Sequence, residues 1–117
     1  MTPRIILLNG PAGVGKTTVG RALAATAANG VCIHGDDLKH FIVTQQPGQV
    51  AAGLAYQNAA SVARNFAGGG YELIVVEFVF EHPRHVARFC TALATDSIPI
   101  HLFTLWAPLE LVLQRER

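Results

Sequence analysis

The segment GPAGVGKT at residues 10–17 constrains the fold of this chain most, because it matches the pattern G-x-x-x-x-G-K-[ST]. An apolar run at residues 5–8 precedes it and a helical pattern follows, which is the strand, loop and helix order that such a loop requires. Its glycines let backbone N–H groups turn inward and wrap a di- or triphosphate. The sequence therefore predicts an α/β domain that binds the phosphate tail of a nucleotide.

Each part of this loop has an expected contact with the nucleotide. Lys16 is expected to reach the β- and γ-phosphates, and Thr17 to offer its hydroxyl to a phosphate-bound Mg²⁺. The helix that begins here points its positive dipole end at the same anion. The predicted nucleotide-binding residues are Gly10, Pro11, Ala12, Gly13, Val14, Gly15, Lys16, Thr17 and Thr18.

Length and composition limit the classes of protein. The 117 residues suit a single domain, residues 1–117, but are few for a complete α/β nucleotide enzyme. A net charge of +1 gives no broad basic surface, which disfavours a nucleic-acid partner. No apolar stretch fits a signal peptide or a membrane span, so we expect a cytoplasmic protein with no membrane partner. Its two cysteines, Cys32 and Cys90, should stay reduced and pack in the core.

Apolar runs alternate with helical patterns along the chain, which favours βαβ units and a parallel sheet. Strands are expected at residues 4–9, 31–34, 73–80 and 98–106. Helices are expected at residues 16–28, 49–67 and 83–94, and from Pro108 onward. A further helix is expected to begin with Asp36 or Asp37 as its cap and to end before the break at residues 47–48.

Two neighbouring acids follow the second expected strand. Asp36 and Asp37 are the only acids before Glu72, whereas acids used for solubility would be scattered. Ligands of open parallel sheets bind beyond the carboxyl ends of the strands, where this pair and the phosphate loop converge. One of the pair could accept the proton of a substrate hydroxyl that attacks the γ-phosphate. The alternative role is capping of the helix, and two acids allow both.

Glu77 stands inside or at the end of the apolar strand 73–76, where an acid needs a positive partner. Four apolar residues and then an acid resemble a Walker B segment, which holds Mg²⁺ directly or through water, although aspartate is more usual there. The alternative is a carboxylate at a strand end that faces solvent. Glu81, His82 and Arg84 in the next loop are candidate substrate contacts. The remaining histidines form no metal-like cluster and are expected to pack or face solvent: His34, His40, His85 and His101.

The chain resembles the small P-loop kinases, and most closely the branch around chloramphenicol phosphotransferase, the zeta-toxin-like kinases and related AAA-type small kinases. The resemblance rests on IILLNGPAGVGKTTVGRALA, on GDDLKH at residues 35–40 and on LWAPLELVLQRER at residues 105–117. It implies a three-layer α/β/α fold like that of nucleoside-monophosphate kinases, with strand order 2-3-1-4-5. It also implies transfer of the γ-phosphate of ATP, with Mg²⁺, to a hydroxyl of a small molecule. Lys16, Asp36 and Asp37 are then the catalytic candidates, with Asp36 as the expected base.

The sequence departs from this family at its end. Family members continue into an arginine-bearing lid, a fifth strand and a loop that holds the adenine, whereas this sequence stops at Arg117. Arg115 and Arg117 could be the first lid arginines. We therefore expect a C-terminally incomplete domain without the fifth strand and the lid, as a fragment of a longer kinase or a degenerate one. The alternative function is a non-catalytic ATP-binding module, and a GTPase is disfavoured because no N-K-x-D segment is present.

The acceptor and the oligomeric state stay open in the sequence. The helices between residues 38 and 67 are expected to form the acceptor pocket for a sugar, an antibiotic or a nucleoside. Without a fifth strand, the sheet would have an uncovered edge at strand four or strand one. The candidate pocket residues are Phe41, Gln45, Gln46, Tyr56 and Gln57.

Overall fold

The computed structural model describes residues 2–11, 14–49 and 51–106. Four parallel strands form one sheet in the order β2-β3-β1-β4. The strands are β1 (Arg4–Asn9), β2 (Gly30–His34), β3 (Leu73–Phe78) and β4 (Ile100–Thr104). The helices are α1 (Lys16–Ala24), α2 (Gly35–His40), α3 (Ala51–Gly68) and α4 (Pro83–Leu93).

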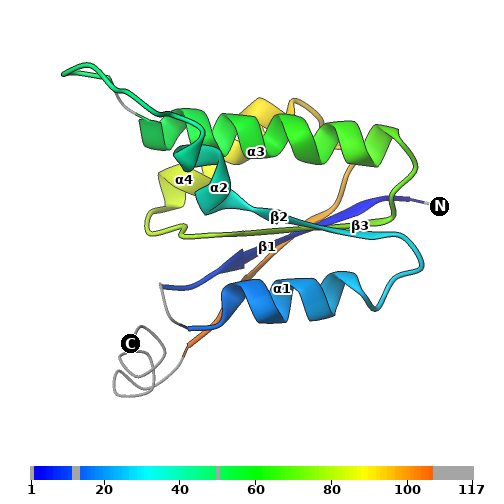
Figure 1. Ribbon diagram of the computed structural model, residues 1–117. Helices are drawn as coiled ribbons and strands as arrows, with labels where there is room; N and C mark the ends of the chain where they lie inside the picture. Colours follow the sequence, from blue (N-terminus) through cyan, green and yellow to red (C-terminus); the bar gives the residue numbers. More distant parts are fainter. Residues whose placement is uncertain (1, 12–13, 50, 107–117) are drawn as a thin grey trace.

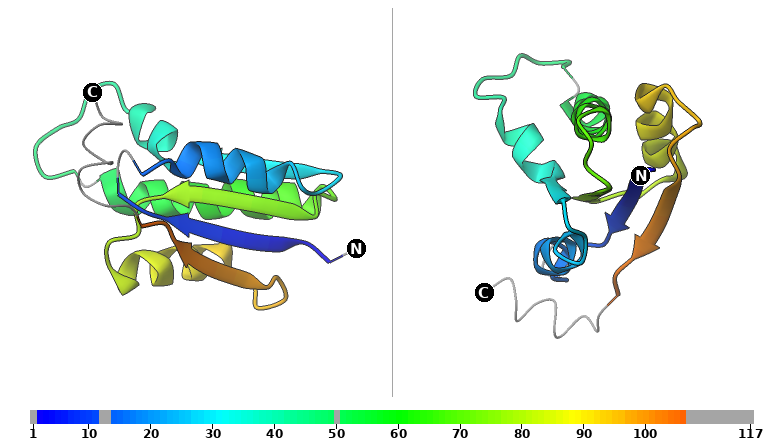
Figure 2. Two further views of the ribbon diagram at one scale, coloured as in Figure 1. Left: turned by 90° about the horizontal axis from the view of Figure 1, so that it is seen from below. Right: turned by 90° about the vertical axis from the view of Figure 1, so that its right-hand side faces the viewer.

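The helices lie on both faces of the sheet, so the molecule has three layers. Helix α1 packs on one face against β3, β2 and β1, while α3 and α4 pack together on the other face (Figures 1 and 2). This arrangement confirms the α/β/α fold and the expected strand order as far as strand four. The part of the chain that the structure describes contains no fifth strand.

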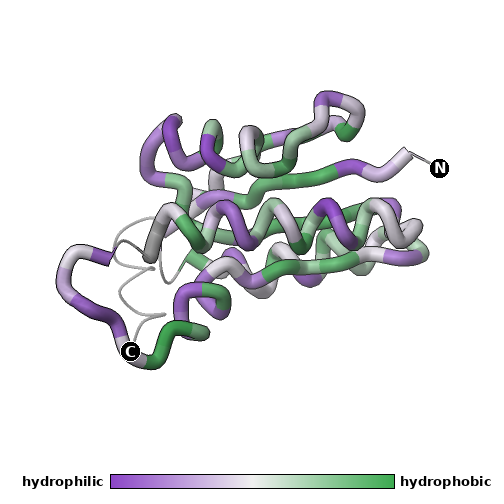
Figure 3. The backbone as a smooth tube through the Cα atoms, turned by 90° about the horizontal axis from the view of Figure 1, so that it is seen from above, coloured by the Kyte–Doolittle hydropathy of each residue, from purple (hydrophilic) through white to green (hydrophobic). Residues whose placement is uncertain are grey.

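Strand β3 is the centre of the molecule, and all of its side chains are buried. Its apolar residues are mostly β-branched, which suits a strand covered on both faces. Ile74 and Val76 belong to the core shared with α3 and α4, whereas Leu73 and Val75 face α1. Figure 3 shows the central strands as long hydrophobic stretches between helices of mixed character.

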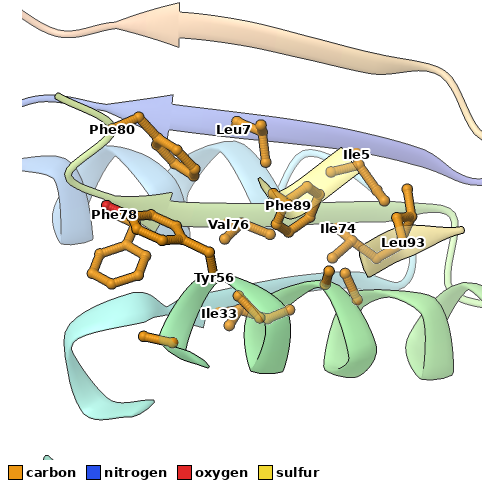
Figure 4. Close-up of a cluster of buried hydrophobic side chains, with 14 residues drawn as sticks. Ile5, Leu7, Ile33, Tyr56, Ile74, Val76, Phe78, Phe80, Phe89 and Leu93 are labelled. Carbon is orange, nitrogen blue, oxygen red and sulfur yellow. The ribbon is translucent and has the colours of Figure 1, made fainter. Parts of the chain in front are cut away.

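The larger core lies between the sheet and the helices α3 and α4 (Figure 4). Helix α3 faces the sheet mainly with alanines, which let the helix axis approach closely. Tyr56 is the large exception, and its ring centroid lies 4.7 Å from that of Phe78 and 5.5 Å from that of Phe80. The fully buried or nearly buried alanines of α3 are Ala55, Ala59, Ala60 and Ala63, a spacing that forms one helical stripe.

Helix α1 ends at Ala24, four residues before the predicted end at residue 28. The chain after it is held by distant residues instead of by the helix. The backbone N–H of Ala28 donates to Glu72 Oε1, and Asn29 bonds both the carbonyl of Gly70 and the backbone N–H of Glu72. These contacts stabilise a turn where local propensity favours helix.

Strand β3 ends at Phe78, two residues before the predicted end. The backbone groups of the next two residues have side-chain partners: Tyr56 donates to the carbonyl of Val79, and Asn9 accepts from the N–H of Phe80. Strand β4 is likewise shorter than predicted, and it forms one edge of the sheet. Since β1 is an interior strand, the expectation that strand one could be an edge is wrong.

The prediction that Asp36 or Asp37 caps α2 is wrong. His34 is the N-cap residue without a side-chain cap bond, and both acids lie in the first turn of the helix. Helix α2 ends at His40, earlier than predicted, and residues 41–49 form no helix or strand. The predicted helix from Pro108 and the candidate lid arginines lie outside the described residues. No helix in the described ranges is both long and apolar enough to cross a membrane.

Candidate functional site

The phosphate loop leaves the end of β1 and enters α1 through Gly15. Gly15 is the N-cap residue of α1 and has a φ of 97°, a left-handed conformation that favours glycine. Because glycine has no side chain, no side-chain cap covers the start of this helix. The first N–H groups of α1 are therefore well placed for an anion. Ala12 and Gly13 lie outside the described residues.

Lys16 is buried, with 9% of its surface exposed, although lysine is usually a surface residue. Its Nζ donates a hydrogen bond to the carbonyl of Pro11, 3.0 Å away across the loop. A buried ammonium group needs such a partner. A phosphate oxygen is a stronger acceptor for it, because both partners are then charged.

Thr17 and Glu77 meet at the start of α1. The hydroxyl of Thr17 donates to Oε2 of Glu77 at 3.1 Å, and Glu77 is only 5% exposed. The alternative that Glu77 faces solvent is therefore wrong. Both side chains offer oxygen, the ligand that Mg²⁺ prefers, and two ligands about 2.0–2.1 Å from one Mg²⁺ lie ~2.9 Å apart when adjacent. The residues present fit a Mg²⁺ ion that takes its other ligands from phosphate and water.

His34 lies beside Glu77 because their strands are paired in register at these residues. His34 Nδ1 is 3.4 Å from Glu77 Oε1, and its Nε2 is 3.3 Å from Nη1 of Arg21. Sequence reasoning gave His34 no role beyond packing and did not single out Arg21. The contact between His34 and Glu77 depends on the register between β2 and β3, which no local sequence pattern reveals.

Asp36 and Asp37 follow β2 at the same end of the sheet and are exposed. In the described part of the chain, neither carboxylate has a hydrogen bond or an ion pair. Gly35 places them: a Cβ there would lie 2.2 Å from the ring of Phe78, so only glycine lets α2 start against β3. Burial, then the charges of Glu81 and Asp36, raise the pKa of Tyr56, so Asp36 lies within electrostatic reach of this phenol.

The loop after β3 adds further polar groups near Tyr56. Glu81 and His82 in this loop are exposed, as is Arg84 in the first turn of α4. Their role as substrate contacts stays a prediction. The ring of His85 stacks on Tyr56 with centroids 4.8 Å apart. Burial is the main cause that lowers the pKa of His85, and the charge of Arg84 adds to it.

The other candidate acceptor residues are dispersed. Gln57 is half-buried on α3, whereas the rest lie exposed in the segment 41–49: Phe41, Gln45 and Gln46.

Asn9 is a site residue that sequence reasoning missed. Its Oδ1 accepts the N–H of Phe80 at 2.7 Å, and its Nδ2 donates to Oγ1 of Thr104 at 3.3 Å. It thus joins the ends of β1, β3 and β4 next to the phosphate loop. A polar residue at the end of an apolar strand was the available signal. A pocket of about 410 Å³ opens there, lined by Asn9, Gly10, Pro11, Val79, Phe80, Glu81 and Thr104.

Comparisons with known proteins agree with the fold. The model of the AAA domain family, AAA_33, matches residues 5–117. No match was found among the curated proteins. The APS kinase of Mycobacterium tuberculosis, solved with AMPPNP and APS, superposes with a TM-score of 0.76 at 19% identity, covering 98% of this chain and 69% of that one.

Two other solved structures are similar. The tunicamycin resistance protein of Deinococcus radiodurans has a TM-score of 0.68 and 25% identity over 100% of this chain and 69% of its own. A gluconokinase of Sinorhizobium meliloti has a TM-score of 0.67 and 17% identity over 97% of this chain and 63% of its own. With a family model that matches nearly from end to end, the chain belongs to the AAA domain family and has a P-loop kinase-like fold.

Proposed function

We propose that this chain is the nucleotide-binding part of an ATP-dependent kinase that transfers the γ-phosphate to a hydroxyl of a small molecule. The observation that carries this proposal is the meeting of Lys16, Thr17 and the buried Glu77 at the start of α1. The kinases among the similar structures support it, as does the AMPPNP bound in one of them. At the finer level, we propose the branch around chloramphenicol phosphotransferase and the zeta-toxin-like kinases.

The phosphate loop would bind the nucleotide by exchanging an internal contact for a ligand. The ammonium group of Lys16 would leave the carbonyl of Pro11 and bind the β- and γ-phosphates, while the N–H groups at the start of α1 bind further oxygens. Thr17 and Glu77 would hold Mg²⁺, which neutralises the charge that develops on the transferring phosphoryl group. The side chains of Lys16, Thr17 and Glu77 stand on α1 and β3, two elements that pack against each other.

The acceptor hydroxyl needs a base on the open side of the site. Asp36 is our candidate, with Asp37 as the alternative, because both extend from the first turn of α2 and have no competing partner in the described residues. The acceptor itself would lie against Tyr56 and His85, with Glu81 and Arg84 at its rim. Mixed charge around an aromatic pair suits a polar small molecule with both hydroxyl and ionic groups.

Calorimetry with ATP and Mg²⁺ tests the binding step. The chain has only two lysines, so Lys39→Ala is a matched control for Lys16→Ala. We expect Lys16→Ala to abolish measurable binding and Lys39→Ala to retain it. Equal binding by the wild type and Lys16→Ala would disprove the assignment of the phosphate site.

ADP release with a panel of hydroxyl compounds tests the transfer step in the same samples. We expect release that depends on one compound class and falls by about 10²-fold or more in Asp36→Asn, because a general base contributes roughly 10²–10⁴-fold. Full activity in Asp36→Asn together with loss of activity in Asp37→Asn would assign the base to Asp37. Binding without any compound-dependent release would identify a module that binds the nucleotide without transferring its phosphate.

A further inference from the structure

Four side chains form a connected chain between α1, β2 and β3. Thr17 and Arg21 are four residues apart, so they lie on the same face of α1. Thr17 contacts Glu77 on β3, and Arg21 contacts His34 on β2. His34 and Glu77 in turn face each other across the two paired strands.

Gly20 allows this close approach of α1 to the sheet. A Cβ at Gly20 would lie 3.0 Å from Sγ of Cys32 and 3.6 Å from Cβ of Glu77. The helix therefore sits directly above the β2–β3 pair at this point. Of the four side chains, Glu77 is buried and His34 is half-buried beneath this part of the helix. Thr17 and Arg21 reach them from the exposed side of α1.

Arg21 decides which nitrogen of His34 carries the proton. A guanidinium group can only donate hydrogen bonds, so Nη1 of Arg21 donates to Nε2 of His34 across 3.3 Å. Nε2 must then be the unprotonated nitrogen of a neutral imidazole. The single ring proton is left on Nδ1, the nitrogen that faces Glu77.

The Nδ1 atom of His34 is fully buried and, within the described residues, has no hydrogen bond of good geometry. The nearest acceptor is Oε1 of Glu77 at 3.4 Å, slightly beyond the usual range. A buried donor without a bond is unfavourable, so a small rotation of either side chain that closes this gap is favoured.

We propose that His34 is a positioning residue for the metal-binding carboxylate, held in its Nδ1–H tautomer by Arg21. By donating to Oε1, His34 fixes the orientation of the Glu77 carboxylate and leaves Oε2 facing Thr17 and the metal. The two carboxylate oxygens thus have separate tasks. This inference rests on the proposed function, because it requires that Thr17 and Glu77 bind the Mg²⁺ of a nucleotide.

Two isosteric substitutions test the donor. The amide nitrogen of asparagine can occupy the place of Nδ1, whereas that of glutamine reaches the place of Nε2. We expect His34→Gln to weaken the binding of ATP in the presence of Mg²⁺ about tenfold, the lower range for losing an outer-shell partner of a metal ligand. His34→Asn should stay within about twofold of the wild type. Binding of ATP in EDTA should be the same in all three proteins.

The metal-free measurement separates positioning from a merely structural role. If His34→Gln weakens ATP binding equally with and without Mg²⁺, the defect is purely structural and the proposal is overturned. The proposal is also overturned if His34→Gln and the wild type bind ATP with equal affinity in the presence of Mg²⁺. If the wild type itself binds no Mg²⁺–ATP, the proposed function fails, and this inference fails with it. The two failures are therefore distinguishable in one experiment.

The tautomer can be measured directly in the wild-type chain. A long-range ¹H–¹⁵N spectrum of the imidazoles distinguishes a protonated Nδ1 from a protonated Nε2, and His34→Asn identifies the His34 signals by their loss. We expect the Nδ1–H form in the wild type. An Nε2–H form would overturn the role of Arg21 and the donation to Glu77.

Discussion

The two edge strands of the sheet, β2 and β4, have the same length but very different surroundings. Helices α1 and α3 cover β2, and only its first residue is exposed. On β4 four of the five residues are exposed, including Leu102 at 48% and Phe103 at 55%. The right-hand view of Figure 2 shows α1 beneath the β2 side of the sheet, away from β4.

This difference follows from the crossover connections and shows why the site lies where it does. The helix that connects β1 to β2 covers the β2 side of one face, and in doing so brings Thr17 and Arg21 to Glu77 and His34. The described residues contain no such cover on the corresponding side of β4. On the β2 side, the same helix therefore both covers the edge of the sheet and assembles the site. Substitutions on the two edges should differ accordingly.

The largest effect is expected from Ile33→Ala in β2. Ile33 is 7% exposed and belongs to the main core, so its truncation should lower the free energy of unfolding by about 2–4 kcal/mol. Urea unfolding followed by circular dichroism measures this loss. Ile33→Val, with a smaller expected loss of about 1 kcal/mol, is the control for volume. A loss below that of the valine variant would show that β2 is less firmly covered than its burial indicates.

Gly35→Ala, just after β2, should lower the free energy of unfolding by about 1–3 kcal/mol, because the added methyl group would overlap the ring of Phe78. Gly68→Ala is the matched control, since a Cβ there meets no atom within 4 Å. Thermal unfolding of both variants measures the contrast. Equal stability of the two variants would mean that α2 can shift away from β3 without loss.

Cys32 gives β2 a pH dependence. Burial, then the charge of Glu77, raise the pKa of the thiol from 9.0 to about 11. The folded chain therefore keeps this proton to higher pH than the unfolded chain, and the stabilisation is complete below pH 9 and lost between pH 9 and about 11. Because the thiol is half-buried, the loss should be below about 1 kcal/mol.

Urea unfolding of the wild type and Cys32→Ala over this pH range measures the effect. The difference in unfolding free energy between the two proteins should be constant up to pH 9 and shift against the wild type above it. If the difference in unfolding free energy between the wild type and Cys32→Ala stays constant to pH 11, the result would contradict the burial of this thiol.

The smallest effect is expected from Phe103→Lys on β4. Its side chain is more than half exposed at 55%, so a charged replacement should change the free energy of unfolding by less than about 0.5 kcal/mol. Chemical unfolding is the measurement, with His101→Lys on the same strand as control. A loss of several kcal/mol would show that this edge is covered in solution and would remove the contrast with β2.

Local patterns in the sequence were enough to predict the parallel sheet and the bounds of β1, and the family resemblance implied the three layers. The turn after α1 was not predictable, because Asn29 and Glu72 stabilise it from opposite ends of a long connection. In the site, Lys16 follows from motif spacing and Glu77 from an acid in an apolar run. The contacts of His34 and Asn9 depend on strand register and on loop ends, which arise only when distant segments pack.

The strand order has a consequence for how the chain acquires its structure. In the described residues, β1 pairs with β3 and β4, which lie far along the chain at residues 73–78 and 100–104. Until β3 is available, β1 and the phosphate loop attached to it have no partner in the sheet. Parallel pairings of such large sequence separation form slowly, because a long loop must close before any contact is gained. The phosphate loop at residues 10–17, which defines the site, is thus among the last segments to be held in place.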